Sequence, residues 1–341
     1  MDSTSTNIQK PTLNGVISAL KSEHTTVEKL ATEVGIFTIK KGSQWLQEAM
    51  LKPTPKALYG AFWNEGETCF MFAETNAGKS IKAVQIAENI SHQQPVIYFD
   101  FELSDKQFEN RYSDNYTNHY QFQDNFLRAE INIDNADYEE AGFENMEDYI
   151  CDSIERAVKS TGVKVIIVDN ITYLGTETEK SKSALPLMKR LNRMKKQHGL
   201  SLLVLAHTPK RNQSQPLTIN DMAGSKNLMN FCDSAFAIGE SAKDPNLRYL
   251  KQIKSRNAVK EFNAENVAVY EITKRENFLA FTLVHTSCER EHLKQYTEDD
   301  RTAFKDKAIE LSRSGKSQRE IANELNIAVG TVNKYIRNNI N

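Results

Sequence analysis

The 341-residue sequence has no apolar run long enough to span a membrane, and its first ten residues, MDSTSTNIQK, have no apolar signal core. Its four cysteines lie far apart, with no CxxC pair and no nearby pair of histidines. We therefore expect reduced core thiols, with neither disulfides nor a metal cluster. A net charge of −2 provides no general attraction to nucleic acid. These absences predict a cytoplasmic protein without a membrane partner.

The composition, 39% hydrophobic and 26% charged, is that of a globular protein, but the charge is unevenly distributed. Residues 103–150 hold 12 Asp and Glu against 3 Lys and Arg. We interpret the acidic, tyrosine-rich segment 111–148 as a solvated insertion that is loop-like except for a short strand pattern at 126–131. Residues 301–341 hold 8 Lys and Arg against 4 Asp and Glu, which makes the tail a candidate polyanion binder. We expect an N-terminal extension (1–57), a core domain (58–285), a linker (286–300) and a C-terminal domain (301–341).

The stretch 67–85, ETCFMFAETNAGKSIKAVQ, joins a strand pattern at 68–72 to a helical pattern at 81–90. The loop between them ends in Gly-Lys-Ser, as in a phosphate-binding loop whose backbone N–H groups surround a triphosphate. We expect Lys79 to reach the β- and γ-oxygens and Ser80 to bind Mg²⁺. Ala73 stands where the general pattern has glycine. The predicted nucleotide-binding residues are Ala73, Glu74, Thr75, Asn76, Ala77, Gly78, Lys79, Ser80 and Ile81.

Two more apolar runs end in carboxylates: PVIYFDFE at 95–102, and 163–168 followed by Asp169. Ligands bind at the carboxyl ends of strands in an open α/β sheet. We therefore expect Glu102 to be the general base for the water that attacks the γ-phosphate. Asp169 is expected to bind Mg²⁺ or to orient its water shell. The alternative for the first run is that Asp100 or Glu102 only caps the next helix.

A third buried run, 200–206, ends in His207. A polar side chain there can bond the γ-phosphate and report its loss to the following loop, and a purely structural histidine is the alternative. That loop, 209–225, is polar and long, which is typical of functional or disordered segments. The basic helical pattern at 185–197 is interpreted as a charged outer helix face.

Strand patterns at 234–239, 248–253, 267–272 and 279–284 then predict an antiparallel sheet edge. Lys254 and Arg256 follow one of these strands. On a monomer they are ordinary surface charges, whereas in a ring or filament they can reach a neighbour's γ-phosphate.

The tail has the pattern helix, turn, helix, with the small Ala322 at the helix crossing, which predicts a DNA-binding helix-turn-helix. Its last helix offers Asn333, Lys334 and Arg337 to DNA, although a three-helix unit can also bind protein. At the other end of the chain, 13–34 shows helical spacing and is expected to pack on the core or to bind a partner. Phe62 and Trp63 either flank a base or, as we favour, pack in the core.

The order AETNAGKS, VIYFDFE, VKVIIVDN, LLVLAHT, AGSKNLMNFCDSAFAI and YLKQIKSRN resembles the RecA-like ATPases. Within them it resembles the plasmid RepA-type hexameric helicases and the DnaB-like replicative helicases, over about 58–284. The resemblance implies an α/β fold with a mostly parallel, twisted RecA-like sheet, an antiparallel β edge and a hexameric assembly. It also implies roles for single residues: Glu102 as catalytic glutamate, Asp169 as Walker B aspartate, His207 as sensor, and Lys254 and Arg256 as trans-acting fingers.

The resemblance further implies that the loop between His207 and Asn227 contacts DNA in a central channel, with the cations Lys210, Arg211 and Lys226. The tail separately is similar to the resolvase-type helix-turn-helix. We therefore expect an oligomeric, ATP- and Mg²⁺-dependent ATPase acting on DNA, a replicative-type helicase or DNA-remodelling protein of a plasmid or mobile element. The alternatives are a nucleotide-switched DNA-binding regulator without unwinding, and a signalling or defence ATPase without DNA contact.

Overall fold

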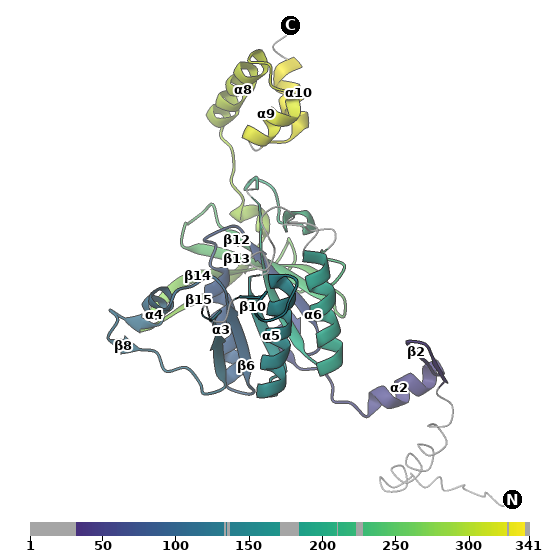
Figure 1. Ribbon diagram of the computed structural model, residues 1–341. Coiled ribbons are helices and arrows are strands. Elements are labelled where there is room, and N and C mark those ends of the chain that lie inside the picture. The colour runs from purple at the N-terminus through teal and green to yellow at the C-terminus, as the bar shows by residue number, and fades with distance from the viewer. Residues whose placement is uncertain are drawn as a thin grey trace, which may run out of the picture. The chain divides into compact units, whose positions relative to one another are not determined.

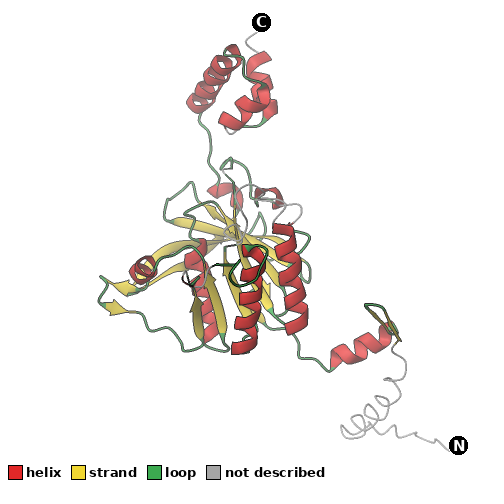
Figure 2. Ribbon diagram, in the orientation of Figure 1, coloured by secondary structure: helices red, strands yellow, loops and turns green. Residues whose placement is uncertain are grey.

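The computed structural model describes residues 32–132, 134, 137–170, 184–209, 211–222, 228–325 and 327–337. The chain divides into two compact units, Met1–Pro55 and Lys56–Asn341. Figures 1 and 2 show their helices and strands. Within the described part of the chain, no helix is both long and apolar enough to cross a membrane.

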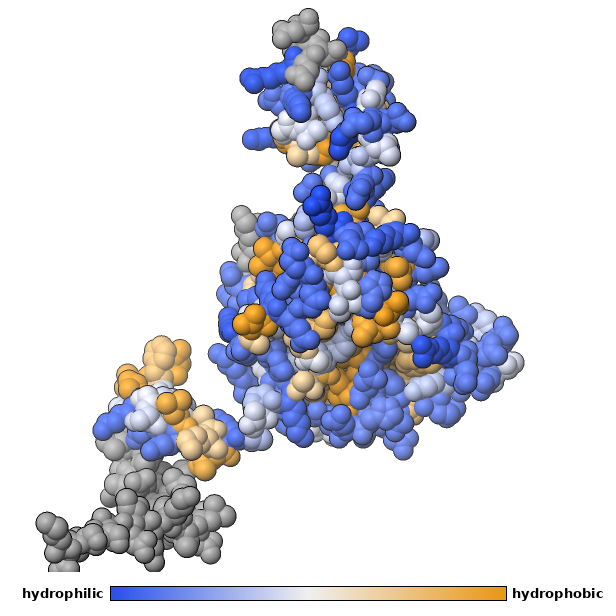
Figure 3. All heavy atoms as spheres, turned by 180° about the vertical axis from the view of Figure 1, so that it is seen from behind, coloured by the Kyte–Doolittle hydropathy of each residue, from blue (hydrophilic) through white to orange (hydrophobic). Residues whose placement is uncertain are grey.

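The described part of the N-terminal unit, from residue 32 onward, contains a short hairpin, β1 (Thr32–Val34) and β2 (Phe37–Ile39), and the helix α2 (Gly42–Met50). Gly35, with φ of +58°, turns the hairpin, and only glycine adopts that conformation without strain. The helical prediction for 13–34 is therefore wrong at Thr32–Val34, and its remainder lies outside the described residues. Apolar side chains, among them those of Ile36 and Met50, are exposed on this unit (Figure 3).

The second unit is built on a nine-stranded sheet in the order β15-β14-β13-β12-β5-β11-β10-β6-β9. The strands from β12 to β9 are parallel, and β13, β14 and β15 continue the sheet in antiparallel fashion. The predicted mostly parallel sheet with an antiparallel edge is thus confirmed. The strands are β5 (Thr68–Ala73), β6 (Val96–Asp100), β9 (Phe126–Ala129), β10 (Val165–Asp169), β11 (Ser201–His207), β12 (Ser234–Glu240), β13 (Leu247–Ser255), β14 (Val267–Arg275) and β15 (Phe278–Ser287).

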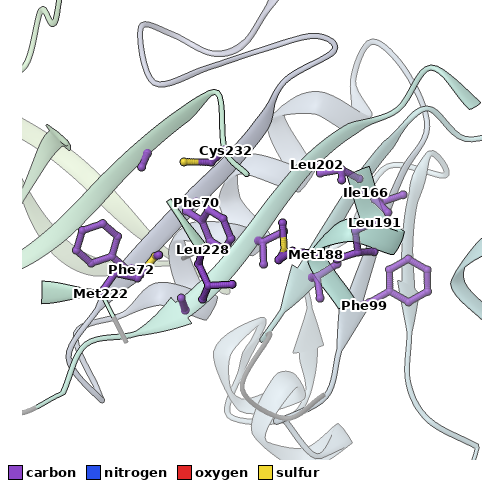
Figure 4. Close-up of a cluster of buried hydrophobic side chains, with 14 of the residues drawn as sticks. Phe70, Phe72, Phe99, Ile166, Met188, Leu191, Leu202, Met222, Leu228 and Cys232 are labelled. Carbon is purple, nitrogen blue, oxygen red and sulfur yellow. The ribbon is translucent and has the colours of Figure 1, made fainter. Parts of the chain in front are cut away.

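Helices cover both faces of this sheet, and for that reason its parallel strands are apolar throughout. The side chains of β5 alternate between two hydrophobic clusters, so that Phe70 and Phe72 enter one and Cys69 and Met71 the other. Helices α5 (Met146–Thr161) and α6 (Ala184–His198) bury their apolar stripes in the first cluster, part of which is drawn in Figure 4. Helix α3 (Lys79–Ser91), which directly follows the phosphate loop, packs in the second.

The acidic segment is only partly a solvated insertion. Asp137, Glu139, Glu140 and Glu144 are exposed, as expected. Helix α4 (Asp105–Arg111) precedes the insertion, whose earlier part contains the hairpin β7 (Ser113–Asp114) and β8 (Asn118–His119) and the edge strand β9, where the sequence has a strand pattern. There Tyr112 is buried, and Phe122 stacks on Phe126 with ring centroids 4.6 Å apart. Aromatic side chains therefore attach this segment to the core despite its net charge.

Two short strands, β3 (Ala57–Tyr59) and β4 (Trp63–Asn64), precede β5. Phe62 and Trp63 are buried there among core side chains, which confirms the favoured core-packing prediction. A short 3₁₀ turn, η5 (Ile219–Asp221), lies in the polar loop after β11.

The predicted linker is not wholly exposed, because the 3₁₀ turn η6 (Glu289–His292) is folded into the core unit. Buried Glu289 accepts from the backbone N–H of Leu217 at 2.8 Å and pairs with Lys251 at 2.5 Å. Three helices follow: α8 (Glu298–Arg313), α9 (Gln318–Leu325) and α10 (Val329–Arg337). They share a small core of their own, formed by Ala308, Leu311, Ile321, Ala322 and Val332.

Candidate nucleotide site

The phosphate loop leaves β5 at Ala73 and enters α3 at Lys79. Gly78 has φ of +96°, and a Cβ atom there would lie 2.9 Å from the ring of Phe281, so this position requires glycine. Ala73 is the last residue of β5, and its methyl group is buried in the core cluster beside α3. Alanine can therefore replace glycine at position 73, because its methyl group packs in the core at the end of β5 and not in the Gly-Lys-Ser turn.

Lys79 extends under the loop, where its Nζ donates to the carbonyl oxygens of Ala73 at 3.1 Å and Glu74 at 3.0 Å. Burial lowers the pKa of this ammonium group, and the carboxylates of Asp169 and Glu102 oppose that shift. The loop opens into a cavity of about 580 Å³. The cavity is lined by Thr75, Asn76, Gly78, Lys79, Ser80, Ile81, Phe101, Glu102, Leu103, Gln107, Arg111 and His207.

Asp169 lies at the end of β10 and is completely buried. The phenol of Tyr98 donates to its Oδ2 at 2.6 Å, whereas its Oδ1 has no hydrogen-bond partner. Burial raises the pKa of this carboxyl group to about 6, although the hydroxyl groups of Ser80 and Tyr98 act in the opposite direction. An unsatisfied carboxylate oxygen near the Ser80 hydroxyl is the oxygen donor set that Mg²⁺ prefers.

Mg²⁺ characteristically takes few ligands from the protein and the rest from water and phosphate. Here the unpartnered Oδ1 of Asp169 and the hydroxyl group of Ser80 are such a small set of protein ligands. The residues present at the loop therefore fit a Mg²⁺ ion that arrives together with the nucleotide.

Glu102 and His207 both line the cavity, and Asn170 contacts both of them. Nε2 of His207 lies 3.3 Å from Oε1 of Glu102 and 2.9 Å from the amide nitrogen of Asn170, and this amide donates to Glu102. The hydrogen bond from His207 holds the pKa of Glu102 below its ordinary value, and burial partly offsets this. The site therefore contains an ionised carboxylate that lines the cavity and whose side chain is 37% exposed.

The capping alternative for Glu102 does not match the geometry. Asp100 accepts from the backbone N–H groups of Glu102 and Leu103 at 3.2 and 3.0 Å and also binds Arg128. Ser104 begins α4, in a capping box with Gln107. Both capping functions are thus filled, which leaves the Glu102 carboxylate directed to the cavity.

Lys254 and Arg256 lie at the far end of the sheet from the phosphate loop. Ser255 pairs with Ser234, which pairs with Cys69 near the start of β5, whereas the loop follows the end of β5. Lys254 donates to the backbone carbonyls of Met229 and Cys232 at 2.6 and 2.7 Å, within its own chain.

Arg256 is 58% exposed and binds Asp233 at 2.9 Å. Within one chain, then, neither predicted finger reaches the cavity. Arg256, unlike Lys254, has a side chain exposed enough to contact a second copy of the chain.

The residues predicted to contact DNA differ in how exposed their side chains are. Lys210 and Lys226 lie outside the described residues. The side chain of Arg211 is only 9% exposed and faces Asp221 at 3.4 Å, while its backbone N–H donates to Glu74 of the phosphate loop at 3.2 Å. In α10, Val332 points into the helical core, Lys334 and Arg337 are exposed, and Asn333 is half-buried.

Sequence reasoning missed four of the residues that line the cavity, Phe101, Leu103, Gln107 and Arg111, and it missed Asn170, which contacts Glu102 and His207. Asn170 directly follows Asp169 at the end of a predicted strand, and this position in the sequence could have identified it as a site residue. Arg111 ends an ordinary amphipathic helix, where a cation is expected for electrostatic reasons alone, and nothing in the sequence distinguishes it.

The sheet order, the loop and its carboxylates define a P-loop nucleotidase with a RecA-like core. A family model described as "AAA domain" matches residues 41–213, just over half of the chain. The chain belongs to this AAA-domain family.

Among solved structures, the chain is similar to a KaiC-like protein from the hyperthermophilic archaeon Pyrococcus horikoshii OT3. The identity is 15% and the TM-score 0.45, over 64% of this chain and 91% of that one. No curated protein matches the sequence.

Proposed function

We propose that this chain is a Mg²⁺-dependent ATP hydrolase that acts on DNA as a homo-oligomer. The observation that carries the hydrolase assignment is that Lys79, Ser80, Glu102 and His207 line one cavity, while the buried Asp169 interacts with Ser80. They come from α3 and from the carboxyl ends of three neighbouring parallel strands, and the AAA-domain match covers all of them.

In this site the chain's own groups do most of the work by position and charge. The loop N–H groups and Lys79 bind the β- and γ-phosphates, while Mg²⁺, when bound at Ser80 and Asp169, neutralises charge on the same oxygens. Glu102, kept ionised by its hydrogen bonds, orients the attacking water and accepts its proton. His207 contacts Glu102 and is the last residue of β11, directly before the polar loop, so it suits a response to loss of the γ-phosphate.

The test is the rate of ATP hydrolysis without DNA, with single-stranded DNA and with duplex, measured with particle mass at each nucleotide state. We expect Mg²⁺-dependent hydrolysis that DNA stimulates and that Lys79→Ala abolishes. DNA-stimulated hydrolysis unchanged in Lys79→Ala would refute the assignment.

A homo-oligomer, a hexamer by the family resemblance, is proposed because of where Arg256 lies. An exposed guanidinium at the sheet end opposite the phosphate loop suits a head-to-tail contact, in which it approaches the nucleotide of the next copy. Such contacts close into rings or extend into filaments.

Action on DNA is supported by the outer face of α6. This helix contains no Asp or Glu, and its exposed Lys189, Arg193 and Lys196 line an open groove together with Asn230. Among the residues that the structure describes, these three cations form no ion pair, unlike Arg190 of the same helix, which binds Asp148. Lysines and amides in an open groove suit a phosphate backbone. We propose a helicase or DNA-remodelling activity of the plasmid RepA or DnaB-like kind, in a mobile element.

The second candidate is a nucleotide-switched DNA-binding regulator, which the exposed Lys334 and Arg337 of α10 favour. A helicase should translocate on single strands with little sequence preference. A regulator should protect one duplex sequence from cleavage and lose that protection in Arg337→Ala. The two assays separate the candidates without reference to the shared ATP site.

A further inference from the structure

The polar loop after β11 is attached to the phosphate loop through Glu74, the residue that follows β5. The Glu74 carboxylate accepts from the backbone N–H of Arg211 at 3.2 Å and from the side-chain amide of Gln213 at 3.4 Å. The backbone carbonyl of Glu74 accepts from Nζ of Lys79 at 3.0 Å. Glu74 therefore connects the phosphate-binding lysine to the polar loop.

The same loop also holds the linker that leads to the C-terminal helices. The backbone N–H of Lys294 donates to the carbonyl of Gln213 at 3.0 Å. The hydroxyl of Tyr296 donates to Oδ1 of Asn212 at 3.2 Å, and its ring meets that of Phe304 in α8 edge-on, with centroids 5.1 Å apart. Tyr296 thus contacts the polar loop with its hydroxyl and the first C-terminal helix with its ring.

The contacts of residues 294–296 with the loop are of the kind that can open without unfolding the core. Gln213 and Lys294 are exposed and Tyr296 is half-buried. Hydrogen bonds near the surface open easily, because water replaces the lost partner. The preceding turn η6 is held differently, by the buried pair of Glu289 and Lys251, and should stay folded when residues 294–296 detach.

A bound triphosphate acts directly on Glu74. Lys79 has three N–H donors, and two of them go to the carbonyls of Ala73 and Glu74. Phosphate oxygens are charged and therefore stronger acceptors, so they draw the ammonium group away from these carbonyls. The negative charge of the triphosphate also repels the Glu74 carboxylate. Both effects disturb the residue on which the attachment of the polar loop depends.

We propose that triphosphate binding releases linker residues 294–296 from the polar loop and thereby frees the three C-terminal helices. The linker and the triphosphate favour different arrangements of Glu74, so each weakens the binding of the other. In the proposed function Lys334 and Arg337 of α10 contact DNA, and release of the linker makes their access to DNA depend on the nucleotide. The inference rests on the proposed nucleotide site and adds a form of regulation to it.

The first measurement is hydrogen exchange in the full chain, followed by mass spectrometry on peptides that cover 288–304. Lys294 is the reporter, because its amide proton is held by the carbonyl of Gln213 only while the linker is attached. Exchange is compared with and without a non-hydrolysable ATP analogue and Mg²⁺. Calorimetry gives the affinity for the same analogue.

Two variants loosen the attachment at different points. Tyr296→Phe removes the hydroxyl that bonds the polar loop and keeps the ring. Gln213→Glu places a carboxylate next to Glu74 and Glu240, which now accept from the Gln213 amide at 3.4 and 3.5 Å. Tyr138→Phe is the matched control, because its hydroxyl bonds only the neighbouring Glu139 among the described residues.

We expect the analogue to speed exchange at Lys294 in wild type by about threefold or more. Both variants should exchange faster before the analogue is added. They should also bind it about 2- to 10-fold more tightly, the range for loss of a hydrogen bond that opposes the ligand. Tyr138→Phe should match wild type in both measurements.

Exchange at Lys294 that the analogue leaves unchanged or slows would overturn the inference. So would variants that bind the analogue no more tightly than Tyr138→Phe does. Either outcome leaves the proposed ATP hydrolase standing. That proposal fails instead if wild type itself does not bind the analogue.

Discussion

The Glu102 carboxylate and the His207 imidazole lie 3.3 Å apart, although 105 residues separate them in the chain. They follow β6 and end β11, two strands separated in the sheet by β10, whose following residue, Asn170, contacts both. The ends of three neighbouring strands thus converge on one carboxylate that lines the cavity.

Glu102→Gln should abolish hydrolysis while preserving nucleotide binding. The amide keeps the size and hydrogen bonds of the side chain but cannot accept the proton of the attacking water, so we expect kcat to fall by about 10²- to 10⁴-fold. Single-turnover hydrolysis and ATP affinity should be measured together. Near-normal hydrolysis in this variant would remove Glu102 from the role of general base.

The acid side of the pH profile should depend on His207. Because the hydrogen bond from His207 lowers the pKa of Glu102, the base stays ionised to a pH below the ordinary glutamate value of about 4.3. His207→Ala removes that bond, so the pH at which activity falls should move upward. His207→Gln, which can still donate, should shift it less. Profiles of kcat/KM at saturating Mg²⁺ test this, and coincident profiles for wild type and His207→Ala would contradict it.

Arg256 should act on a neighbouring copy. Neither Arg256→Ala nor Lys79→Ala should hydrolyse ATP alone, but in a mixture some interfaces combine an intact phosphate loop with an intact Arg256. We therefore expect the mixture to regain part of the wild-type rate. Lys254→Ala is the comparison, because its ammonium group is bonded within its own chain and its loss should mainly reduce stability. An inactive mixture that still co-assembles would rule out action in trans.

The Lys251 to Glu289 pair should stabilise the attachment of the 289–292 turn to the core. Both side chains are largely buried, so Lys251→Met leaves a buried carboxylate without its cation and should cost about 3 kcal/mol of unfolding free energy. Lys251→Met combined with Glu289→Met should recover part of that loss. Denaturant titrations at neutral pH give both values. A double variant as unstable as the sum of the single variants would mean that the two charges are not coupled.

One thiol should react in the native protein. Burial raises the pKa of Cys151 to about 12 and of Cys232 to about 11, and burial also raises that of Cys69. These three are protonated and shielded at pH 8, whereas Cys288 is partly exposed. Mass spectrometry after brief alkylation should show one adduct, which disappears in Cys288→Ser. Rapid modification at two or more sites would contradict the buried positions.

Much of the core was predictable because its signals are local. The run 68–73 is apolar on both faces, the Gly78-Lys79-Ser80 turn follows it directly, and Asp169 ends another such run. Parallel strands buried between helix layers leave continuous apolar runs in sequence, and their carboxyl ends must meet. The hairpin at 32–39 was missed because three-residue strands have too few positions to show a period.

By itself, then, the sequence determined the strand-loop-helix unit, the carboxylates at the strand ends and the switch to an antiparallel edge. Only the tertiary structure decided which groups share the cavity. The register of β13 on β12 carries Arg256 to the far end of the sheet, and the packing of α4 turns an ordinary helix-terminal Arg111 toward the phosphate loop. Both outcomes depend on contacts between residues distant in the chain, which no local pattern encodes.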